Sequence, residues 1–306
     1  MSASGLGYAD VRAASERIAG VTRPVALAHG GERTWFALEF LQHTGSFKAR
    51  GALNFLSERR AAGRLPAAGV AIASGGNAGL AAAWAAAREG VPATVFTPTT
   101  APAVKVARLR ALGAEVRQVG TEYAEAAEAC AEFVAESGAL ASHAYDQPLV
   151  AAGAGTLVEE IVAARPSVTT VVVAVGGGGL LAGVAAAAAE HGLDVVGVEP
   201  AHCRAWHAAL EAGRVVDVPV ASVAADSLGA RRVSADALWW GRQPHVRAEL
   251  VEDEAIVAAR LRLWREHRIA VEHAAATALA GAPEGTAGEV CVVLCGANTD
   301  PSDLAG

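Results

Sequence analysis

The sequence has few basic residues for its length and no long apolar run, and each shortage excludes a class of function. Lys and Arg number 25 against 32 Asp and Glu, which gives a formal net charge of −7 at pH 7. The basic residues are dispersed, so no stripe exists that could neutralise the phosphates of a nucleic acid. No stretch approaches the roughly 20 apolar residues of a membrane-spanning helix, and the N-terminus has no apolar signal-peptide core. We therefore expect neither a nucleic-acid nor a membrane partner.

Cysteines and aromatic residues are also scarce. The four cysteines, Cys130, Cys203, Cys291 and Cys295, form no C-x-x-C pair, which argues against a disulfide framework and favours a cytoplasmic location. The nine histidines show no H-E-x-x-H or comparable spacing, so catalytic zinc is not expected. With only 6 Trp, 3 Tyr and 6 Phe, the core must be packed from small aliphatic side chains.

Short apolar runs alternate with Ala-rich helical stretches along most of the chain. The runs are apolar throughout rather than at every second residue, which indicates parallel sheets covered on both faces. We expect strands at 35–40, 69–74, 93–98, 115–119, 169–175, 194–199 and 289–295, and helices at 49–59, 79–89 and 180–191. This order predicts an α/β fold built from two parallel-sheet domains.

The domain boundaries follow from the order of these elements. Residues 67–119 read as a β-α-β-α-β unit that closes on itself, and a second α/β block begins near Asp146. The strand at 35–40 is expected to join the second block. We therefore predict a large domain of residues 1–42 and 144–306 and a small domain of residues 43–143.

Lys48 stands out in the segment from 42 to 52, which reads Q-H-T-G-S-F-K-A-R-G-A. It follows a small-residue turn and the aromatic Phe47, and it begins a helical run. An arbitrary lysine is usually a solvated surface charge, but this placement aims the amine at a cleft. A Schiff-base lysine needs a lowered pKa, which partial burial and a cationic neighbour provide.

This segment resembles the S-F-K-x-R-G cassette of the serine/threonine dehydratases, which are fold-type II enzymes that use pyridoxal 5′-phosphate (PLP). The resemblance covers about residues 34 to 298, with the family's motifs in order. It implies a tryptophan synthase β-like fold with PLP in the cleft between the two domains. It also implies that Lys48 forms the Schiff base and later serves as the base at Cα, with Phe47 beside the cofactor.

A second small-residue loop, Ser74-Gly75-Gly76-Asn77-Ala78, follows a strand and opens a helix. Free N–H groups at a helix N-terminus bind anions, and Asn77 can donate to a phenolic oxygen. An ordinary strand-to-helix turn with a Ser cap is the alternative. The loop resembles the family's S-x-G-N loop, which implies that all five residues bind the substrate and that Asn77 holds the 3′-oxygen of PLP.

Two residues of this loop bear on the activity. Ala78 matches the N-A-G form of mammalian-type serine dehydratases. Gly75 stands where related serine racemases have a serine that acts as acid and base on the second face of the substrate. Because glycine has no proton to give, we rank elimination above racemisation.

The tetraglycine run Gly176-Gly177-Gly178-Gly179 follows a strand, and Leu180 starts a helix. Successive glycine N–H groups can form a nest around a phosphate. The run also fits a G-x-G-x-x-A dinucleotide fingerprint, with Glu199 at about the ~20-residue spacing of a ribose-binding acid. The residues alone leave both interpretations open, whereas the resemblance implies that the four glycines and Leu180 bind the phosphate of PLP.

Cys295 ends the last expected strand, at the carboxyl edge where α/β sheets place ligands. A plain buried thiol is the alternative. The resemblance implies that Cys295 lies near the pyridine nitrogen of PLP, in the form found in serine dehydratases. A thiol there leaves that nitrogen largely unprotonated, which favours quick β-elimination. Glu272 belongs to a V-E-H segment where the family has V-E-P, and the resemblance places it near the active site.

Glu199 and Cys203 align with a cation site of some relatives. The resemblance implies a monovalent cation held by the Glu199 carboxylate and the Cys203 carbonyl, with Leu228 and Ala230 as further carbonyl ligands. Ala205 stands where divalent-binding relatives have an Asp, so Mg²⁺ is not expected. A surface salt pair is the alternative for Glu199.

Together these motifs predict a PLP-dependent ammonia-lyase that converts a small hydroxy-amino acid, such as L-serine or L-threonine, into an α-keto acid and ammonia. The alternatives are a related racemase, a β-replacement enzyme, a dehydratase of a specialised hydroxy-amino acid, an NAD-dependent oxidoreductase and a non-catalytic amino-acid-binding protein. The resemblance implies a homodimer. We expect His43, Ala154 and Ala230 to set the side-chain preference.

Overall fold

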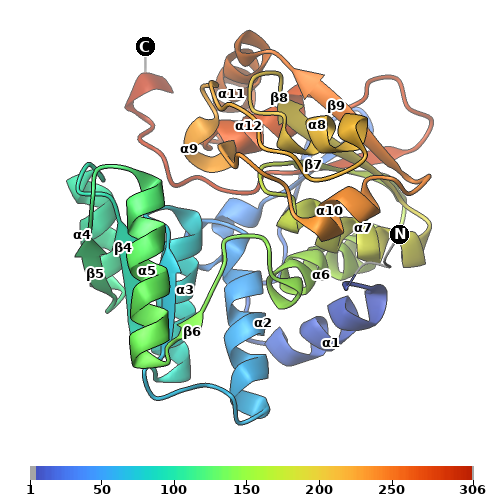
Figure 1. Ribbon diagram of the computed structural model, residues 1–306. Coiled ribbons are helices and arrows are strands. Elements are labelled where there is room, and N and C mark those ends of the chain that lie inside the picture. The colour runs from blue at the N-terminus through green and yellow to red at the C-terminus, as the bar shows by residue number, and fades with distance from the viewer. Residues whose placement is uncertain (1–4, 305–306) are drawn as a thin grey trace.

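The computed structural model describes residues 5–304, which form two β-sheets with helices around them (Figure 1). The six-stranded sheet has the order β1-β2-β10-β7-β8-β9, and the four-stranded sheet has the order β5-β4-β3-β6. Neighbouring strands are parallel except for β1 and β2, which are antiparallel. The predicted α/β fold with parallel sheets is confirmed.

The six-stranded sheet holds the largest part of the core. Its strands are β1 (Leu27–Gly31), β2 (Thr34–Ala37), β7 (Val168–Ala174), β8 (Asp194–Pro200), β9 (Val246–Val251) and β10 (Glu289–Val293). All but one residue of β7 are buried, and β7 and β8 contact both α7 (Gly179–His191) and α12 (His273–Ala280). A strand buried on both faces needs apolar side chains throughout, which explains the continuous apolar run at 169–175.

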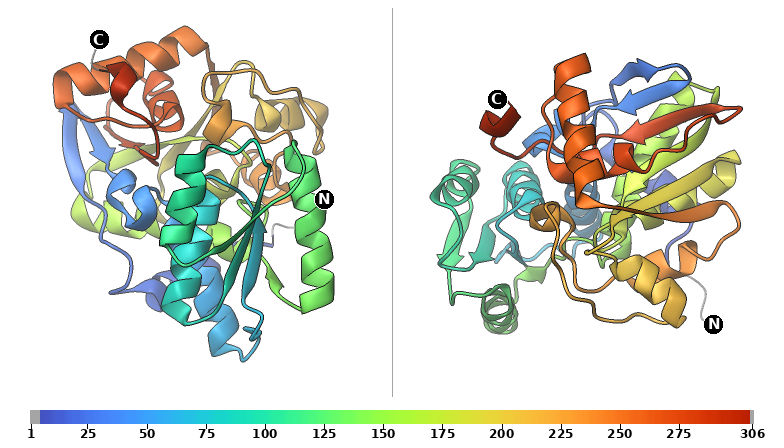
Figure 2. Two further views of the ribbon diagram at one scale, coloured as in Figure 1. Left: turned by 90° about the vertical axis from the view of Figure 1, so that its left-hand side faces the viewer. Right: turned by 90° about the horizontal axis from the view of Figure 1, so that it is seen from above.

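The four-stranded sheet consists of β3 (Val70–Ala73), β4 (Ala93–Thr97), β5 (Glu115–Gln118) and β6 (Leu140–Ala141). Its helices are α3 (Asn77–Glu89), α4 (Ala103–Ala111) and α5 (Tyr123–Ser137). Ile72 and Val95 pack with Leu80 of α3, whereas Phe96 packs with Cys130 of α5. Because successive strand residues point to opposite faces, this sheet is also covered on both sides. Figure 2 shows it, with its helices, as a separate group beside the six-stranded sheet.

The helices α2 (Lys48–Ala61) and α6 (Pro148–Ala164) lie between the two sheets and contact each other. The sequence analysis expected a core packed from small side chains, and small residues do let neighbouring helices pack closely here. A Cβ on Gly183 of α7 would lie 2.0 Å from the Ala151 carbonyl oxygen of α6, so only glycine fits there. The remaining helices are α1 (Tyr8–Ile18), η1 (Glu39–Leu41), η2 (His43–Gly45), α8 (Ala205–Ala212), α9 (Ala225–Leu228), α10 (Ala235–Trp240), α11 (Asp253–His267) and η3 (Ser302–Leu304).

Three strands escaped the sequence analysis, each for a physical reason. The small unit does not end at residue 119, because β6 adds a fourth strand, and β6 has only two residues. The strand β1 carries two glycines and pairs at the edge of its sheet. The strand β9 is half exposed at the other edge, so its residues alternate instead of forming an apolar run.

The expected joining of the N-terminal strand to the second block is confirmed, because β2 pairs in parallel with β10. The strands β3 to β6 all lie within residues 43–143, and the other six lie outside that range. The division into domains of residues 1–42 with 144–306 and of residues 43–143 stays a prediction. In the described part of the chain, no helix is long and apolar enough to cross a membrane.

A buried ion cluster ties the start of α2 to its surroundings. The Arg50 side chain is fully buried and donates twice to Glu39 of η1, at 2.8 Å each, and twice to Glu160 of α6, at 2.7 and 2.8 Å. The Thr156 hydroxyl accepts a further bond at 3.2 Å. One guanidinium therefore joins three elements, and its charge is compensated by two carboxylates.

We expect Arg50→Met to lower the free energy of unfolding by about 3–5 kcal/mol, because it leaves the Glu39 carboxylate buried without its partner. Urea unfolding measures this. Arg64→Met is the control, since its pair with Glu58 is exposed and is worth about 0–1 kcal/mol. Equal losses in the two variants would contradict this role of Arg50.

Candidate active site

A backbone clamp seats Lys48 at the carboxyl end of β10. Ser46 and Gly296 form an antiparallel bridge, the Phe47 N–H donates to the Cys295 carbonyl at 3.0 Å, and the Ala297 N–H donates to the Gly45 carbonyl at 3.0 Å. The strand β10 lies between β2 and β7 in the six-stranded sheet. The clamp therefore holds the first turn of α2 at the carboxyl ends of the strands, where α/β folds bind ligands.

The Lys48 amine is half-buried and donates to the Ala144 carbonyl at 2.6 Å. Its Nζ lies 4.9 Å from the centroid of the Phe47 ring. Burial lowers the pKa of Lys48 to about 8, against the opposing effects of Cys295 and Glu272. The expected cationic neighbour is therefore not the cause of the lowered pKa. A substantial fraction of the amine is neutral near pH 8, the form in which it is a nucleophile and a base.

Two acidic groups face this amine. Burial raises the pKa of the Cys295 thiol far above its ordinary value, so the thiol stays protonated. Glu272 is also buried, and its backbone N–H donates to the Gly296 carbonyl at 3.1 Å. Burial raises the pKa of the Glu272 carboxyl, whereas the hydrogen bond from the Asn77 amide lowers it. His273, which replaces the family's proline, is the first residue of α12. Proline is common at that position, so the helix begins there with either residue.

The asparagine loop connects β3 to α3 and reaches Glu272. The Asn77 Nδ2 donates to both Glu272 carboxylate oxygens, at 2.9 and 3.0 Å. The Gly76 N–H approaches the Ser74 hydroxyl at 3.4 Å. The first N–H groups of α3 have no acceptor within the helix, so together with the helix dipole they can bind an anion. The residues from 73 to 77 are half-buried, and Ala78 is buried.

The tetraglycine loop follows β7 and lies against Tyr145. A Cβ on Gly177 would lie 2.2 Å from the Tyr145 ring, and Gly178 has φ +90° and would bring a Cβ to 2.3 Å from Ala237. The helix α7 begins at Gly179, one residue before the predicted Leu180. Side chains are therefore excluded from this loop, and the first N–H groups of α7, which have no acceptor within the helix, can bind a phosphate.

One short turn places the glycine loop next to Lys48. The Ala144 carbonyl accepts from Lys48, and the following residue, Tyr145, covers Gly177. The His143 Nδ1 accepts the Asp146 N–H at 2.8 Å and holds this turn. No motif indicated the role of Ala144, because only its backbone carbonyl is used. The structure therefore brings together Lys48, Asn77, Glu272, Cys295 and the tetraglycine loop.

Glu199 and Cys203 form a separate cluster after β8. Glu199 is fully buried, and its two oxygens accept the N–H groups of Trp206 and His207 at 2.8 Å each. The alternative interpretation of Glu199 as part of a surface salt pair is therefore wrong. Glu199 caps α8 from a fully buried position and is not exposed to a ribose, which weakens the interpretation of the glycine loop as a dinucleotide site. Residues 5–304 contain no group of three or more His, Cys, Asp or Glu that could hold a metal ion.

Three residues were expected to set the preference for the substrate side chain: His43, Ala154 and Ala230. Ala154 is 2% exposed within the main core, so that expectation is wrong. The His43 ring stacks on Trp84 at 4.5 Å, and its Nε2 lies 3.1 Å from the Val21 carbonyl. The role of Ala230 stays a prediction.

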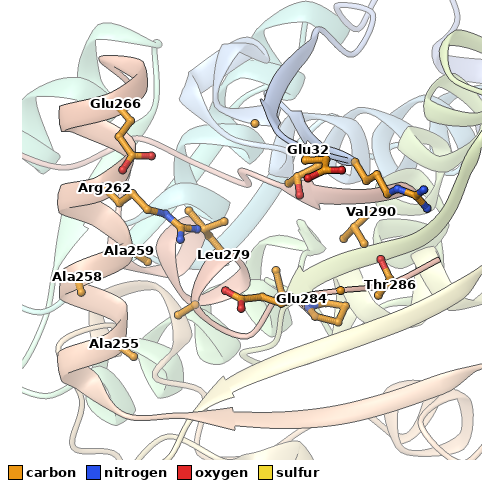
Figure 3. Close-up of a pocket in the computed structure, with 17 residues that line it drawn as sticks. Glu32, Ala255, Ala258, Ala259, Arg262, Glu266, Leu279, Glu284, Thr286 and Val290 are labelled. Carbon is orange, nitrogen blue, oxygen red and sulfur yellow. The ribbon is translucent and has the colours of Figure 1, made fainter. Parts of the chain in front are cut away.

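A cavity of about 630 Å³ opens away from these residues, between α11, α12 and the β1–β2 turn. Figure 3 shows Arg262 and Glu266 on one wall and Glu32 and Glu284 on others. None of the residues predicted for the active site line it. The size of a cavity alone therefore does not locate the active site in this chain.

Residues 21–296 match the family described as pyridoxal-phosphate dependent enzyme. The chain is 36% identical to an L-threonine ammonia-lyase of Geobacter sulfurreducens, over 98% of this chain and 77% of that protein. It is 35% identical to a serine dehydratase-like protein of Rattus norvegicus, over 88% and 86%. The solved structure of maize serine racemase has a TM-score of 0.89 and 26% identity, over 98% and 96%.

The lowered pKa of Lys48 is testable because the chain contains only two lysines, Lys48 and Lys105. With a pKa of about 8, we expect reductive methylation of Lys48 to reach half its maximal rate near that pH. An ordinary lysine titrates near 10.4. Peptide mapping after a short exposure to formaldehyde and cyanoborohydride measures the rate at each lysine. A midpoint for Lys48 near 10.4 would contradict the effect of burial.

Proposed function

The chain belongs to the pyridoxal-phosphate dependent enzymes, within the serine/threonine dehydratase family, and on that premise we propose that it is an ammonia-lyase acting on small hydroxy-amino acids. The reaction removes the α-proton and the β-hydroxyl of a substrate such as L-serine or L-threonine and yields an α-keto acid and ammonia. The observation that carries this proposal is the Lys48 amine, whose pKa is lowered to about 8 between the turn at Ala144 and the Asn77–Glu272 pair.

The residues around Lys48 fit PLP. Among the described residues, the Lys48 amine has a single hydrogen-bond acceptor, a carbonyl, so no carboxylate competes for it. The Gly176–Gly179 loop leads into the start of α7, whose first N–H groups can bind a phosphate, and Cys295 offers a protonated thiol to a ring nitrogen. When bound, PLP supplies the electron sink that allows a proton to leave Cα.

Each group has one task in this reaction. The N–H groups at the start of α3, with Ser74, bind the substrate carboxylate. The Gly176–Leu180 segment would hold the cofactor phosphate, with Phe47 and Glu272 beside the ring. Lys48 would hold the cofactor through its amine and would serve as the base that takes the proton from Cα. A base whose pKa lies near the working pH is well matched to this proton transfer.

The racemase alternative needs a proton donor on the second face of the substrate, and Gly75 offers none. A Cβ there would lie 3.2 Å from the Thr97 methyl group, so the neighbouring side chain turns a methyl group, which is no proton donor, toward this position. We therefore favour elimination, although a racemase shares the fold. A β-replacement reaction or a specialised hydroxy-amino acid remains an alternative within the same chemistry.

The experiment that tests the function is the absorbance spectrum of the purified protein. We expect a violet-blue band that borohydride bleaches and that is absent in Lys48→Ala, because no other amine lies at this site. Lys105→Ala, which removes the other lysine, is the matched control and keeps the band. A colourless wild-type protein that takes up no PLP would overturn the proposal.

Product analysis separates the activities that share this band. Wild type is expected to release pyruvate from L-serine and the corresponding keto acid from L-threonine, and Lys48→Ala to release neither. Formation of D-serine faster than pyruvate would contradict the argument from Gly75.

We further propose a monovalent cation between the Glu199 carboxylate and the carbonyl of Cys203. What supports it is that burial raises the pKa of Glu199 to about 8, although two backbone N–H groups oppose the shift. No basic side chain forms an ion pair with this carboxylate in residues 5–304, so a cation with oxygen ligands would stabilise its charge. Carbonyls of Leu228 and Ala230 are further candidates.

If a cation binds there, replacing K⁺ by tetramethylammonium at pH 8 should lower the melting temperature of wild type by several degrees. Glu199→Gln removes the charge and should make the melting temperature insensitive to the exchange. Melting curves in the two salts measure this. An equal response of the two proteins, or none in wild type, contradicts the cation site.

The homodimer and the cytoplasmic location stay predictions. The four cysteines are free and buried, as a reducing compartment allows. The expected absence of nucleic-acid and membrane partners rests on the sequence and stays a prediction as well.

A further inference from the structure

Four side chains form a hydrogen-bonded chain that passes back and forth between the two sheets. Arg108 of α4 donates to the Asn298 Oδ1, the Asn298 Nδ2 donates to the Asn77 Oδ1 at 2.6 Å, and the Asn77 Nδ2 donates to Glu272. Arg108 and Asn77 belong to helices of the four-stranded sheet. Asn298 follows β10, and Glu272 precedes α12, beside the six-stranded sheet. We call these four residues the cross-sheet chain.

The two ends of the cross-sheet chain determine its direction. A guanidinium is only a donor and a carboxylate is only an acceptor, whereas an asparagine amide can present either end. With its oxygen on Arg108, Asn298 must turn its Nδ2 toward Asn77 and toward the Thr44 carbonyl, which accepts at 2.7 Å. Asn77 must then present its oxygen to Asn298 and its N–H groups to Glu272. Those N–H groups are the ones expected to meet the 3′-oxygen of PLP.

Arg108 is otherwise uncommitted. It is exposed on α4, and within residues 5–304 the only hydrogen bond of its side chain is the one to Asn298, with no carboxylate in ion-pair range. A hydrogen bond from a charged donor is stronger than one between neutral groups. The Asn298 amide thus has two bonds that fix its orientation, one from Arg108 and one to the Thr44 carbonyl. Without the bond from Arg108, the Thr44 carbonyl alone would fix that orientation less firmly.

We propose that Arg108 is a positioning residue that acts through Asn298 to keep the N–H groups of Asn77 turned toward the cofactor. This role rests on the proposed function, because it matters only if PLP binds beside Asn77. Without Arg108, the Asn298 amide can rotate and offer its oxygen or its N–H groups to Asn77. Cofactor binding then weakens, while Lys48 and the glycine loop remain in place.

The test compares PLP binding by the full-length protein carrying Arg108→Met, Arg108→Lys or Arg110→Met. Arg110 is the matched control, since it is exposed on the same helix and its side chain makes no hydrogen bond or ion pair in the described part of the chain. Titration of the cofactor-free protein, followed by its absorbance band, gives the dissociation constant. We expect Arg108→Met to weaken binding roughly 5- to 30-fold, as for the loss of one hydrogen bond, and to change the band. Arg108→Lys, which is again only a donor, should restore much of the affinity.

A double-mutant cycle with Asn298→Ala separates positioning from a direct effect of charge. If Arg108 acts through Asn298, Arg108→Met has little further effect on PLP binding in the Asn298→Ala background. An equal loss in both backgrounds overturns the proposed role, and so does wild-type affinity in Arg108→Met. The melting temperature of each cofactor-free variant is measured too, and a fall in stability with unchanged affinity also overturns it.

The outcomes distinguish this role from the function on which it rests. A wild-type protein that takes up no PLP overturns the proposed function and the role of Arg108 together. A wild-type protein that binds PLP, with Arg108→Met unaffected, overturns the role of Arg108 alone.

Discussion

The active site depends on the backbone clamp between residues 45–47 and 295–297. Its bridge and two hydrogen bonds attach the first turn of α2 to the end of β10. The Arg50 cluster and the packing on α6 hold α2 as a whole, but the clamp is what fixes Lys48 at the end of β10. With it, the amine lies beside Cys295, and the turn at Ala144 joins it to the tetraglycine loop. The buried Arg50 cluster supports the same first turn of the helix.

Burial shifts three neighbouring ionisable groups at this site toward their neutral forms. It lowers the pKa of the Lys48 amine and raises the pKa values of the Cys295 thiol and the Glu272 carboxyl. Desolvation penalises the charged form of any group, so the same buried environment lowers the pKa of an amine and raises the pKa of an acid. The result is an amine that can act as a nucleophile and a base near neutral pH beside a thiol that keeps its proton. This combination suits elimination chemistry on an electron-withdrawing cofactor.

The limits of prediction differ from residue to residue. The tetraglycine loop was ambiguous because a phosphate nest and a dinucleotide fingerprint need the same small residues. At Glu199 the structure disfavours the dinucleotide interpretation, because this carboxylate caps α8 from a fully buried position and is not exposed to a ribose. Strands β6 and β9 were missed because a two-residue strand and a half-exposed edge strand have no continuous apolar run. No pattern could indicate Ala144, whose carbonyl alone matters, or Arg108, which resembles any exposed arginine of a helix.

By itself the sequence determined the α/β class, most of the strands and the Lys48, Asn77 and tetraglycine motifs, because each is a run of neighbouring residues with its own local signature. Only the tertiary structure decided which of these motifs meet, and by which atoms. The contacts of Asn77 with Glu272 and Asn298 join residues about 200 positions apart. The pKa of Lys48 and the cross-sheet chain depend on such contacts, because burial and hydrogen-bond direction are set by neighbours in space rather than along the chain.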